Sequence, residues 1–338
     1  MLKACVIGCG CVGPVHMQAI KDLENADLYA VCDNRPERAD KAAETYGAKA
    51  YYSIEEVLAD KEIDIVHIAT PHYLHVDMAI AALSAGKNVV LEKPVAISRE
   101  DLERLSNAEK ASDKKVCVTL QNRYFDNLLA LRELVKDSEK TGKLLGVTGI
   151  ITWDRGETYY KQDPPWRGHW ETEGGSLMCN QAMHLIDLMH VFAGPAERVY
   201  ATISNKRLKG IIETEDTAEA LIEFKSGVRG VFFGANTYTG SKPIQLELDF
   251  ENVRYRYADQ RLYTIYPDGN VEVSQKDCDK KPGKAVWGNG HYRVITDFYN
   301  SLTEGGYYLS LSEILPSAKT LLALYESGKA GGVWTAVE

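Results

Sequence analysis

The stretch Lys3-Ala-Cys-Val-Ile-Gly-Cys-Gly-Cys-Val-Gly13 places a short apolar strand directly before three glycines in the spacing GxGxxG. Glycines in this spacing let the backbone turn tightly, approach a pyrophosphate without a Cβ in the way, and pack the next helix close to the strand. The N-terminus of that helix offers N–H groups to phosphates. Because the motif alone is common by chance, its meaning depends on the residues that follow.

Asp33 is the second part of the pattern, because it ends the next predicted strand, 20 residues after Gly13. An acidic side chain there accepts hydrogen bonds from an adenosine ribose diol and repels a 2′-phosphate. We therefore predict that the chain binds NAD, with NADP as the alternative because Arg35 and Arg38 lie just beyond. A second alternative is that Asp33 only caps the helix that begins at Pro36. The dinucleotide contacts predicted from these two segments are Gly8, Gly10, Cys11, Val12, Gly13, Asp33 and Asn34.

The rest of the first third of the chain supports a parallel sheet. Short apolar runs alternate with helix-period segments, which is typical of βαβ units. Helix boundaries are marked by Pro36 at a first helical position, by Ser53 and Glu56 in a capping box, and by Gly86 after residues 74–85. We predict an α/β fold whose residues 1–122 form a doubly wound Rossmann domain. The expected strands are 4–7, 28–32, 50–52, 63–69, 88–91 and 116–120.

Residues 123–338 are predicted to form a second, α+β domain with a largely antiparallel open sheet. Apolar residues recur with period two in several segments, which fits a sheet with one wet face. A loop rich in Tyr, Trp, Pro and Gly is expected at 155–175. The expected strands include 146–153, 217–224, 228–233, 244–250 and 254–257, and the expected helices are 128–138, 292–303 and 312–327.

Composition excludes several functional classes for these 338 residues. A formal net charge of -9 without any basic run argues against a nucleic-acid partner. No run approaches the ~18 apolar residues of a membrane span, and the first residues do not resemble a secretory leader, so we expect a cytoplasmic protein. The seven cysteines show no CxxC spacing and are expected to be reduced.

The segment Asn88-Val-Val-Leu-Glu-Lys-Pro94 ends a wholly apolar strand with one ionisable amine. Pro94 prevents the strand from continuing and restricts the backbone of Lys93. Burial or a nearby cation would lower the pKa of Lys93 towards the working pH, which suits proton exchange with an alcohol. Lys93 is therefore a candidate catalytic residue. The alternative is a structural salt bridge from Lys93 to Glu92 or another acid.

Thr70-Pro-His72 ends the fourth predicted strand, where ligands bind at the carboxyl edge of such sheets. We expect its backbone to line the nicotinamide ribose. His72 and His75 could form a pair of metal ligands, but no third ligand lies nearby in sequence. We therefore favour roles as helix caps or cofactor contacts. No metal site is predicted.

A second group of polar residues lies in Glu173-Gly-Gly-Ser-Leu-Met-Cys-Asn180 and the following residues to Asp187. Asn180, His184 and Asp187 stand at i, i+4 and i+7, which predicts one helical face. His184 suits an acid or base role on a substrate hydroxyl that Asn180 orients, and Asp187 would hold the His184 tautomer. The alternatives are a core histidine satisfied by Asp187, or a divalent metal held by these three residues.

In this order the motifs resemble the glucose-fructose oxidoreductase, inositol dehydrogenase and rhizopine catabolism family, often written Gfo/Idh/MocA. The resemblance covers nearly the whole chain. It rests on the Gly8 to Gly13 turn followed by His16, on Ala69-Thr-Pro-His72 with His75, on Ala85-Gly-Lys-Asn-Val-Val-Leu-Glu-Lys-Pro94, on Gln121-Asn-Arg-Tyr124, on Trp166-Arg-Gly-His-Trp170, and on Gly174-Gly175 leading to His184 and Asp187.

The resemblance implies that Lys93 and His184 act on a sugar or cyclitol hydroxyl while hydride passes to the nicotinamide. Many members carry aspartate where this chain has Asn180, and often glycine where it has Ala182. Because an amide cannot exchange protons, we expect the chemistry to rest on Lys93 and His184. The further predicted cofactor contacts are Thr70, His72, His75, Glu92, Lys93, Asn122, Trp166 and Arg167, and the predicted substrate contacts are Lys93, Arg123, Tyr159, Asn180 and His184, with Asn122, Tyr160 and Trp170 as further candidates.

The leading hypothesis is thus an NAD-dependent oxidoreductase for a secondary hydroxyl of a sugar, glycoside or cyclitol. Trp287-Gly-Asn-Gly-His291 is similar to members that oxidise UDP-linked amino sugars, which is the alternative. A lyase or hydrolase that oxidises its glycoside transiently is another alternative, and a non-catalytic nucleotide sensor is a third. By resemblance we expect a homodimer or homotetramer through the open face of the second sheet.

Overall fold

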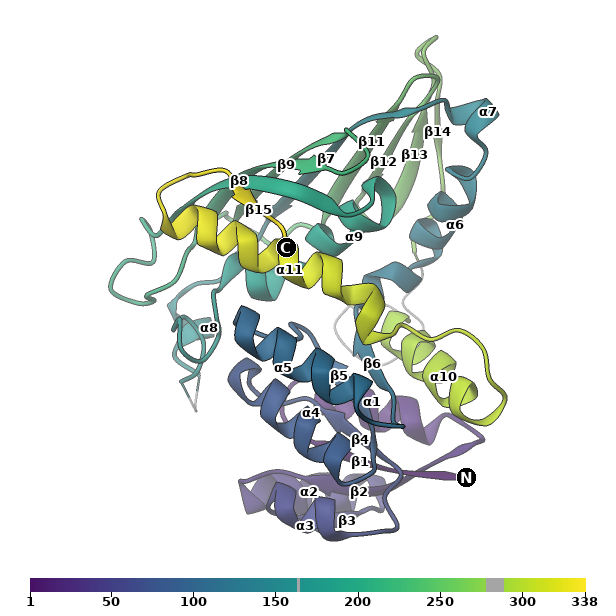
Figure 1. Ribbon diagram of the computed structural model, residues 1–338, viewed down its shortest axis with the longest axis vertical. Helices are drawn as coiled ribbons and strands as arrows, with labels where there is room; N and C mark the ends of the chain where they lie inside the picture. Colours follow the sequence, from purple (N-terminus) through teal and green to yellow (C-terminus); the bar gives the residue numbers. More distant parts are fainter. Residues whose placement is uncertain (163–164, 278–288) are drawn as a thin grey trace. The chain divides into compact units, whose positions relative to one another are not determined.

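The computed structural model describes residues 1–162, 165–277 and 289–338. The chain divides into two units (Figure 1), one with residues 1–121 and the described part of 279–314, the other with the described part of 122–278 and residues 315–338. This grouping differs from the predicted boundary after residue 122 in one segment. Helix α10 (Gly290–Thr303) belongs with the first unit because its buried side packs against α1 (Gly13–Lys21) and β6 (Val116–Thr119).

The first unit is built on a six-stranded sheet in the order β3-β2-β1-β4-β5-β6. Every neighbouring pair is parallel. The order reverses between β1 and β4, and a doubly wound sheet binds its ligand at the carboxyl ends of the strands at such a point. The predicted fold class is confirmed, and the strands are β1 (Leu2–Ile7), β2 (Ala26–Cys32), β3 (Lys49–Tyr51), β4 (Ile65–Ile68), β5 (Asn88–Glu92) and β6.

The helices of the first unit begin where the sequence signals place them. Pro36 opens α2 (Pro36–Tyr46). Ser53 and Glu56 form a reciprocal capping box at α3 (Ile54–Ala59), and Ser98 caps α5 (Arg99–Lys110) by accepting a hydrogen bond from the Asp101 N–H. A short 3-10 turn, η1 (His72–Leu74), leads into α4 (His75–Ser84), and a second one, η2 (Gln121–Tyr124), follows β6.

The second unit contains a nine-stranded sheet in the order β14-β13-β12-β11-β7-β10-β9-β8-β15. All neighbours are antiparallel except β7 and β10. Burial alternates along β9, so one face of the sheet is exposed, as the period-two pattern predicted. The strands are β7 (Leu144–Thr152), β8 (Ala196–Ser204), β9 (Thr217–Phe224), β10 (Arg229–Ala235), β11 (Gln245–Phe250), β12 (Arg254–Ala258), β13 (Arg261–Ile265), β14 (Val271–Val273) and β15 (Thr335–Ala336).

Helices α9 (Met183–Ala193) and α11 (Leu311–Lys329) lie on the other face of this sheet (Figure 1). The Ser327 hydroxyl at the end of α11 accepts a hydrogen bond from the Ala201 N–H of β8 at 2.8 Å, which ties helix to sheet. The single helix expected at 128–138 is divided into α6 (Asp126–Leu134) and α7 (Ser138–Thr141). The loop expected at 155–175 contains α8 (Glu157–Tyr160).

The helix expected after Gly174 and Gly175 begins irregularly, as a π-helical turn, η3 (Leu177–Gln181), before α9. The regular i, i+4 and i+7 repeat predicted for Asn180, His184 and Asp187 is therefore interrupted: Asn180 lies in the π turn, and only His184 and Asp187 lie in α9. The cause of this interruption is tertiary. Buried Glu215 accepts hydrogen bonds from the N–H groups of Ser176 and Met178, so these donors are satisfied outside the helix.

No helix within the described ranges is long and apolar enough to cross a membrane. The six cysteines in these ranges, Cys5, Cys9, Cys11, Cys32, Cys117 and Cys179, form no disulfide with one another. Cys278 lies outside the described residues.

Candidate active site

The glycine turn after β1 has a shape that only glycine permits at two positions. A Cβ on Gly8, which has φ +101°, would lie 2.5 Å from the Ala69 carbonyl oxygen, and a Cβ on Gly13 would lie 2.2 Å from the Gly8 oxygen. Around Gly10, in contrast, a Cβ would meet no described atom within 4 Å. The turn is packed against β4 on one side and open on the other, which fits a pyrophosphate approaching the backbone and the first turn of α1.

Asp33 is held in place by backbone donors at the end of β2. Its Oδ2 accepts a hydrogen bond from the Cys9 N–H at 2.9 Å, and its Oδ1 accepts one from the Arg35 N–H at 3.0 Å. A carboxylate has about four lone-pair positions, so two remain for a ribose diol. The capping alternative accounts only for the Arg35 bond, whereas the Cys9 bond links Asp33 to the glycine turn. These residues fit a dinucleotide.

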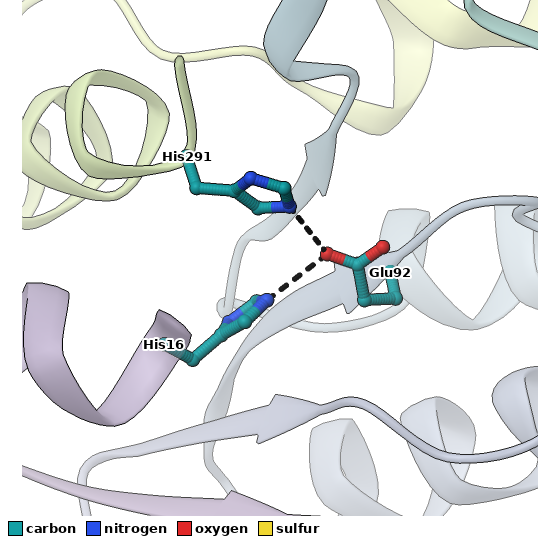
Figure 2. A group of neighbouring side chains, drawn as sticks. All are labelled: His16, Glu92 and His291. Atoms are coloured by element: carbon teal, nitrogen blue, oxygen red, sulfur yellow. Dashed lines mark hydrogen bonds and ion pairs between the residues drawn. The ribbon is translucent and has the colours of Figure 1, made fainter. Parts of the chain in front are cut away.

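Lys93 directly follows β5 at the same edge of the sheet, and its side chain is half-buried. Its neighbour Glu92 points inward instead (Figure 2). One oxygen, Oε1, accepts hydrogen bonds from His16 Nε2 at 3.0 Å, from His291 Nε2 at 3.2 Å and from Thr119 Oγ1 at 2.6 Å. The described contacts of the Glu92 carboxylate are with these three donors and not with Lys93, so the Glu92 form of the salt-bridge alternative is not supported.

The protonation states in this cluster follow from burial and from the donors. Burial alone would raise the pKa of the Glu92 carboxyl, but the hydrogen bonds from His16 and His291 hold it well below its usual range. Burial lowers the pKa of His16, against the opposing pull of Glu92. Glu92 is therefore a buried carboxylate with neutral His16 donating from Nε2.

The network continues away from the sheet edge through two more buried side chains. His16 Nδ1 lies 2.9 Å from His67 Nδ1, and His67 Nε2 lies 2.9 Å from the Tyr299 hydroxyl on α10. Burial, followed by the neighbouring His16, lowers the pKa of His67 well below its usual value. The Tyr299 hydroxyl donates to His67 Nε2, and His67 Nδ1–H donates to His16 Nδ1. Each of the two imidazoles, His67 and His16, is then neutral and uses one nitrogen as donor and the other as acceptor.

His16, Glu92 and His291 also bring three ligand-type atoms within 4.8 Å of one another, the spacing of a metal site. Glu92 Oε1 already receives three hydrogen-bond donors, which accounts for the observed distances. We therefore interpret the cluster as a hydrogen-bonded carboxylate. The sequence motifs include His16 and Glu92, but no periodicity or spacing indicated that His291 or Thr119 would join them.

His75 supports the backbone on both sides of this edge. Its Nδ1 lies 2.8 Å from the Pro94 carbonyl oxygen and its Nε2 lies 3.0 Å from the Thr70 carbonyl oxygen. Burial lowers its pKa, and the charge of Lys93 acts in the same direction. Because both ring nitrogens face carbonyl oxygens, neither points to a metal shared with His72. His75 fixes the ends of β4 and β5 instead.

In the second unit, the predicted substrate residues Tyr159 and Asn180 meet. The Asn180 Nδ2 group donates to the Tyr159 hydroxyl at 3.1 Å and to Glu173 Oε1 at 2.8 Å. The Tyr159 hydroxyl oxygen also accepts a hydrogen bond from Arg167 Nε at 3.2 Å. The guanidinium of Arg167 stacks over the Trp166 ring, 4.3 Å from its centre. This part of the unit therefore presents an amide, a phenol and a guanidinium side by side.

Two other aromatic residues are structural. Tyr160 is buried with Leu208 and Ile212, and its hydroxyl bonds Ser176 at 2.6 Å. Trp170 packs edge-on against Tyr325. The Tyr160 ring also packs edge-on against the Tyr159 ring, with 5.0 Å between the ring centres, so it supports Tyr159 from the buried side.

Arg123 and Asp187 form a buried bidentate ion pair, with Nε to Oδ2 at 2.7 Å and Nη2 to Oδ1 at 2.6 Å. Ser317 donates a further hydrogen bond to Asp187 Oδ1 at 2.8 Å. The expectation that Asp187 holds the His184 tautomer is therefore wrong within the described residues. His184 lies in the first turn of α9 and is 9% exposed. The alternative of a divalent metal held by Asn180, His184 and Asp187 is not supported, because the Asp187 carboxylate is engaged by Arg123 and Ser317.

Comparisons with known proteins agree with this arrangement. Residues 2–120 match a family model described as "Oxidoreductase family, NAD-binding Rossmann fold" and named GFO_IDH_MocA, and residues 128–256 match the GFO/IDH/MocA C-terminal domain. The chain is 27% identical over 231 residues to inositol 2-dehydrogenase of Salmonella typhimurium, covering 67% of this chain and 65% of that protein. It is 27% identical over 191 residues to glucose-6-phosphate 3-dehydrogenase of Bacillus subtilis, covering 56% of this chain and 53% of that protein.

Solved structures extend the similarity over the full length. The WlbA dehydrogenase of Bordetella pertussis, in complex with NADH and UDP-GlcNAcA, matches with a TM-score of 0.86 and 27% identity, over 100% of this chain and 99% of that chain. Levoglucosan dehydrogenase in complex with NADH and levoglucosan matches with a TM-score of 0.89 at 21% identity, over 99% of each chain, which shows the shared fold. The chain spans about two thirds (65%) of the length of the first curated relatives it matches.

Substitutions at Gly10 and Gly13 should separate cofactor binding from folding stability. Gly10→Ala should leave the free energy of unfolding within about 0.5 kcal/mol of wild type, because its Cβ meets no protein atom. It should weaken NADH binding about tenfold or more by occupying the approach of the pyrophosphate. Gly13→Ala should destabilise the protein by about 2 kcal/mol or more. Urea unfolding and NADH fluorescence titration measure both, and unchanged affinity in Gly10→Ala would contradict the assignment.

The Glu92 network should be a large contribution to stability. Glu92→Leu leaves His16, His291 and Thr119 without their shared acceptor, and we expect a loss of about 3 kcal/mol or more. The control Glu92→Gln keeps the shape and one carbonyl oxygen, and should lose about half as much. Urea unfolding at neutral pH measures the difference. Equal stability of the Leu variant and wild type would contradict the network.

Proposed function

Because this chain belongs to the Gfo/Idh/MocA oxidoreductase family, we propose that it is an NAD-dependent dehydrogenase acting on a secondary hydroxyl of a sugar, glycoside or cyclitol. The observation that carries the proposal is the position of Lys93. The lysine follows β5 at the carboxyl edge of the sheet whose β1 leads into the glycine turn, with β4 between the two strands. An amine and a dinucleotide turn at one edge are the parts that alcohol oxidation requires.

Bound NAD would supply the hydride acceptor, and the chain's own residues would bind and orient the substrate and move its proton. We propose that Lys93 and His184 take the hydroxyl proton during oxidation and return it during reduction. Asp33 would bind the adenosine ribose and favour NAD over NADP. The cofactor contacts predicted from the sequence remain part of this proposal, except that the Glu92 carboxylate is engaged by His16, His291 and Thr119.

For the substrate, Tyr159 and Asn180 are the proposed contacts in the second unit, since they present polar groups beside Arg167. Arg123 was predicted to contact the substrate directly. Its guanidinium is paired with Asp187, so we propose that it positions the start of the second unit instead.

A UDP-linked amino sugar is the second candidate substrate. It is favoured by the match to WlbA dehydrogenase, whose structure holds UDP-GlcNAcA and which covers this chain completely. Of the segment predicted to mark this substrate, Trp287 and Gly288 lie outside the described residues, and His291 belongs to the Glu92 network.

We also propose a cytoplasmic homodimer or homotetramer. The support is the exposed face of the nine-stranded sheet, where Leu221 of β9 and Val231 of β10 lie directly opposite each other and are each about half exposed. Exposed apolar side chains grouped in this way are typical of protein interfaces. Light scattering after size-exclusion chromatography tests the oligomeric state.

A substrate screen tests the function. Sugars, glycosides, cyclitols and UDP-sugars are offered with NAD and, in parallel, with NADP, and NADH or NADPH absorbance is followed. We expect stoichiometric NADH from one of these classes. Product release without NADH would instead identify the transient-oxidation chemistry, and tighter binding of NADPH than NADH would overturn the role of Asp33.

Removing either proposed proton carrier should abolish most turnover. Lys93→Ala and His184→Ala should each lower kcat by about a hundredfold or more, the usual scale of acid–base catalysis, while NADH still binds. The matched control Lys110→Ala removes an exposed lysine at the end of α5 and should retain wild-type kcat. Near-normal turnover in Lys93→Ala would refute its catalytic role.

A further inference from the structure

Glu173 is a buried carboxyl group in direct contact with the proposed substrate residue Asn180. Its side chain is 0% exposed. Oε2 accepts a hydrogen bond from the Gly168 N–H at 2.6 Å, and Oε1 accepts one from Asn180 Nδ2 at 2.8 Å. The Gly168 N–H can only donate, so the orientation of Glu173 is fixed from that side.

These contacts decide which way the Asn180 amide points. Its two N–H groups are directed to Glu173 Oε1 and to the Tyr159 oxygen. A flipped amide would set its carbonyl oxygen against the ionised Glu173 oxygen, two acceptors without a proton between them. The hydrogen bonds to Glu173 and Tyr159 thus set the orientation of the amide, with Nδ2 directed to these two residues and Oδ1 at its other end.

We propose that Glu173 is a positioning residue that sets the polarity of Asn180: ionised Glu173 presents the amide oxygen to a substrate hydroxyl, and protonated Glu173 presents the NH2 group. The inference rests on the proposed function, since it takes Asn180 to bind the alcohol substrate. Many members of the family carry an aspartate at the position of Asn180, and a carboxylate there always accepts a hydrogen bond. In this chain the position holds an amide, and Glu173 controls whether its oxygen or its NH2 group faces the substrate.

The surroundings of Glu173 bring its pKa close to neutral pH. Burial raises its pKa to about 7, opposed by the Gly168 and Asn180 hydrogen bonds and by the charge of Arg167, and assisted by Glu215. Among the described residues, the phenols of Tyr159 and Tyr160 also face Glu173, and burial raises the pKa of both, so both stay neutral.

The protonation state of Glu173 decides how KM for the alcohol changes with pH. Above the Glu173 pKa the carboxylate holds the Asn180 N–H groups and Oδ1 accepts from the substrate hydroxyl. As pH falls through about 7, Glu173 gains a proton, donates it to a flipped Asn180, and the substrate meets an NH2 group instead. KM for the alcohol should therefore rise about tenfold below this pH, the effect of one misdirected hydrogen bond.

Glu173→Gln tests this inference, because its shape is that of the protonated side chain. The Gly168 N–H requires an acceptor, so the carbonyl of the new amide faces Gly168 and its NH2 faces Asn180. Asn180 must then flip. We expect KM to rise about tenfold at pH 8 and to lose its dependence on pH near 7, while the pH profile of kcat keeps the shape set by Lys93 and His184.

The double variant Glu173→Gln with Asn180→Asp provides the rescue. The Gln NH2 group would donate to one carboxylate oxygen of the Asp side chain, and the other would again accept from the substrate. KM should return to within about threefold of wild type. An unchanged KM in Glu173→Gln, or a double variant that is worse than either single one, would overturn the proposal.

A measurement without turnover separates this inference from the proposed function. The side-chain NH2 resonances of Asn180, identified by their loss in Asn180→Asp, should shift as pH crosses 7 in the wild-type protein and stay constant in Glu173→Gln. If the chemical shifts of these resonances do not change with pH in the wild type, the role of Glu173 is refuted, even when the protein oxidises sugars. A pH-dependent shift in a protein inactive on every alcohol would support it and count only against the dehydrogenase.

Discussion

The buried carboxylate of Glu92 is the interaction on which the first unit depends. A charge without solvent is stable only with several hydrogen-bond donors, and these come from α1, β6 and α10. The requirement brings α10, which lies in sequence between the two segments of the second unit, back onto the Rossmann sheet. Because Glu92 is fixed inward, the next residue, Lys93, starts from a fixed backbone at the edge where the dinucleotide turn lies. His75 supports the same edge from the other side.

The second unit applies the same rule with three more buried acids. Asp187 is neutralised by Arg123, Glu215 accepts the N–H groups that the π turn exposes, and Glu173 orients Asn180. Each of these acids is tied to backbone groups or to a cation. The Asn180 amide proposed for substrate binding is therefore held by a carboxylate that does not itself meet the solvent.

Much of this could be predicted from the sequence, because local signals were strong. The apolar runs gave the strands of the parallel sheet, the capping box at Ser53 and Pro36 gave helix starts, and Asp33 after the glycine turn indicated the dinucleotide site. Predictions failed where a distant partner overrides local spacing. Regular helical spacing linked Asn180 to Asp187, whereas Glu215 accepts hydrogen bonds from the start of a π turn that contains Asn180. Asp187 pairs with Arg123, which lies 64 residues away in sequence.

By itself, the sequence determined the two kinds of sheet, the nucleotide turn and the ionisable groups that an alcohol dehydrogenase requires, since these follow from periodicity and from residue chemistry within short segments. Only the tertiary structure decided the partner of each buried charge. His291 with Glu92, Arg123 with Asp187 and Glu173 with Asn180 are contacts that depend on how the chain folds back. The physical reason is that a buried charge must be matched in three dimensions, and spacing along the chain does not record which donor will arrive.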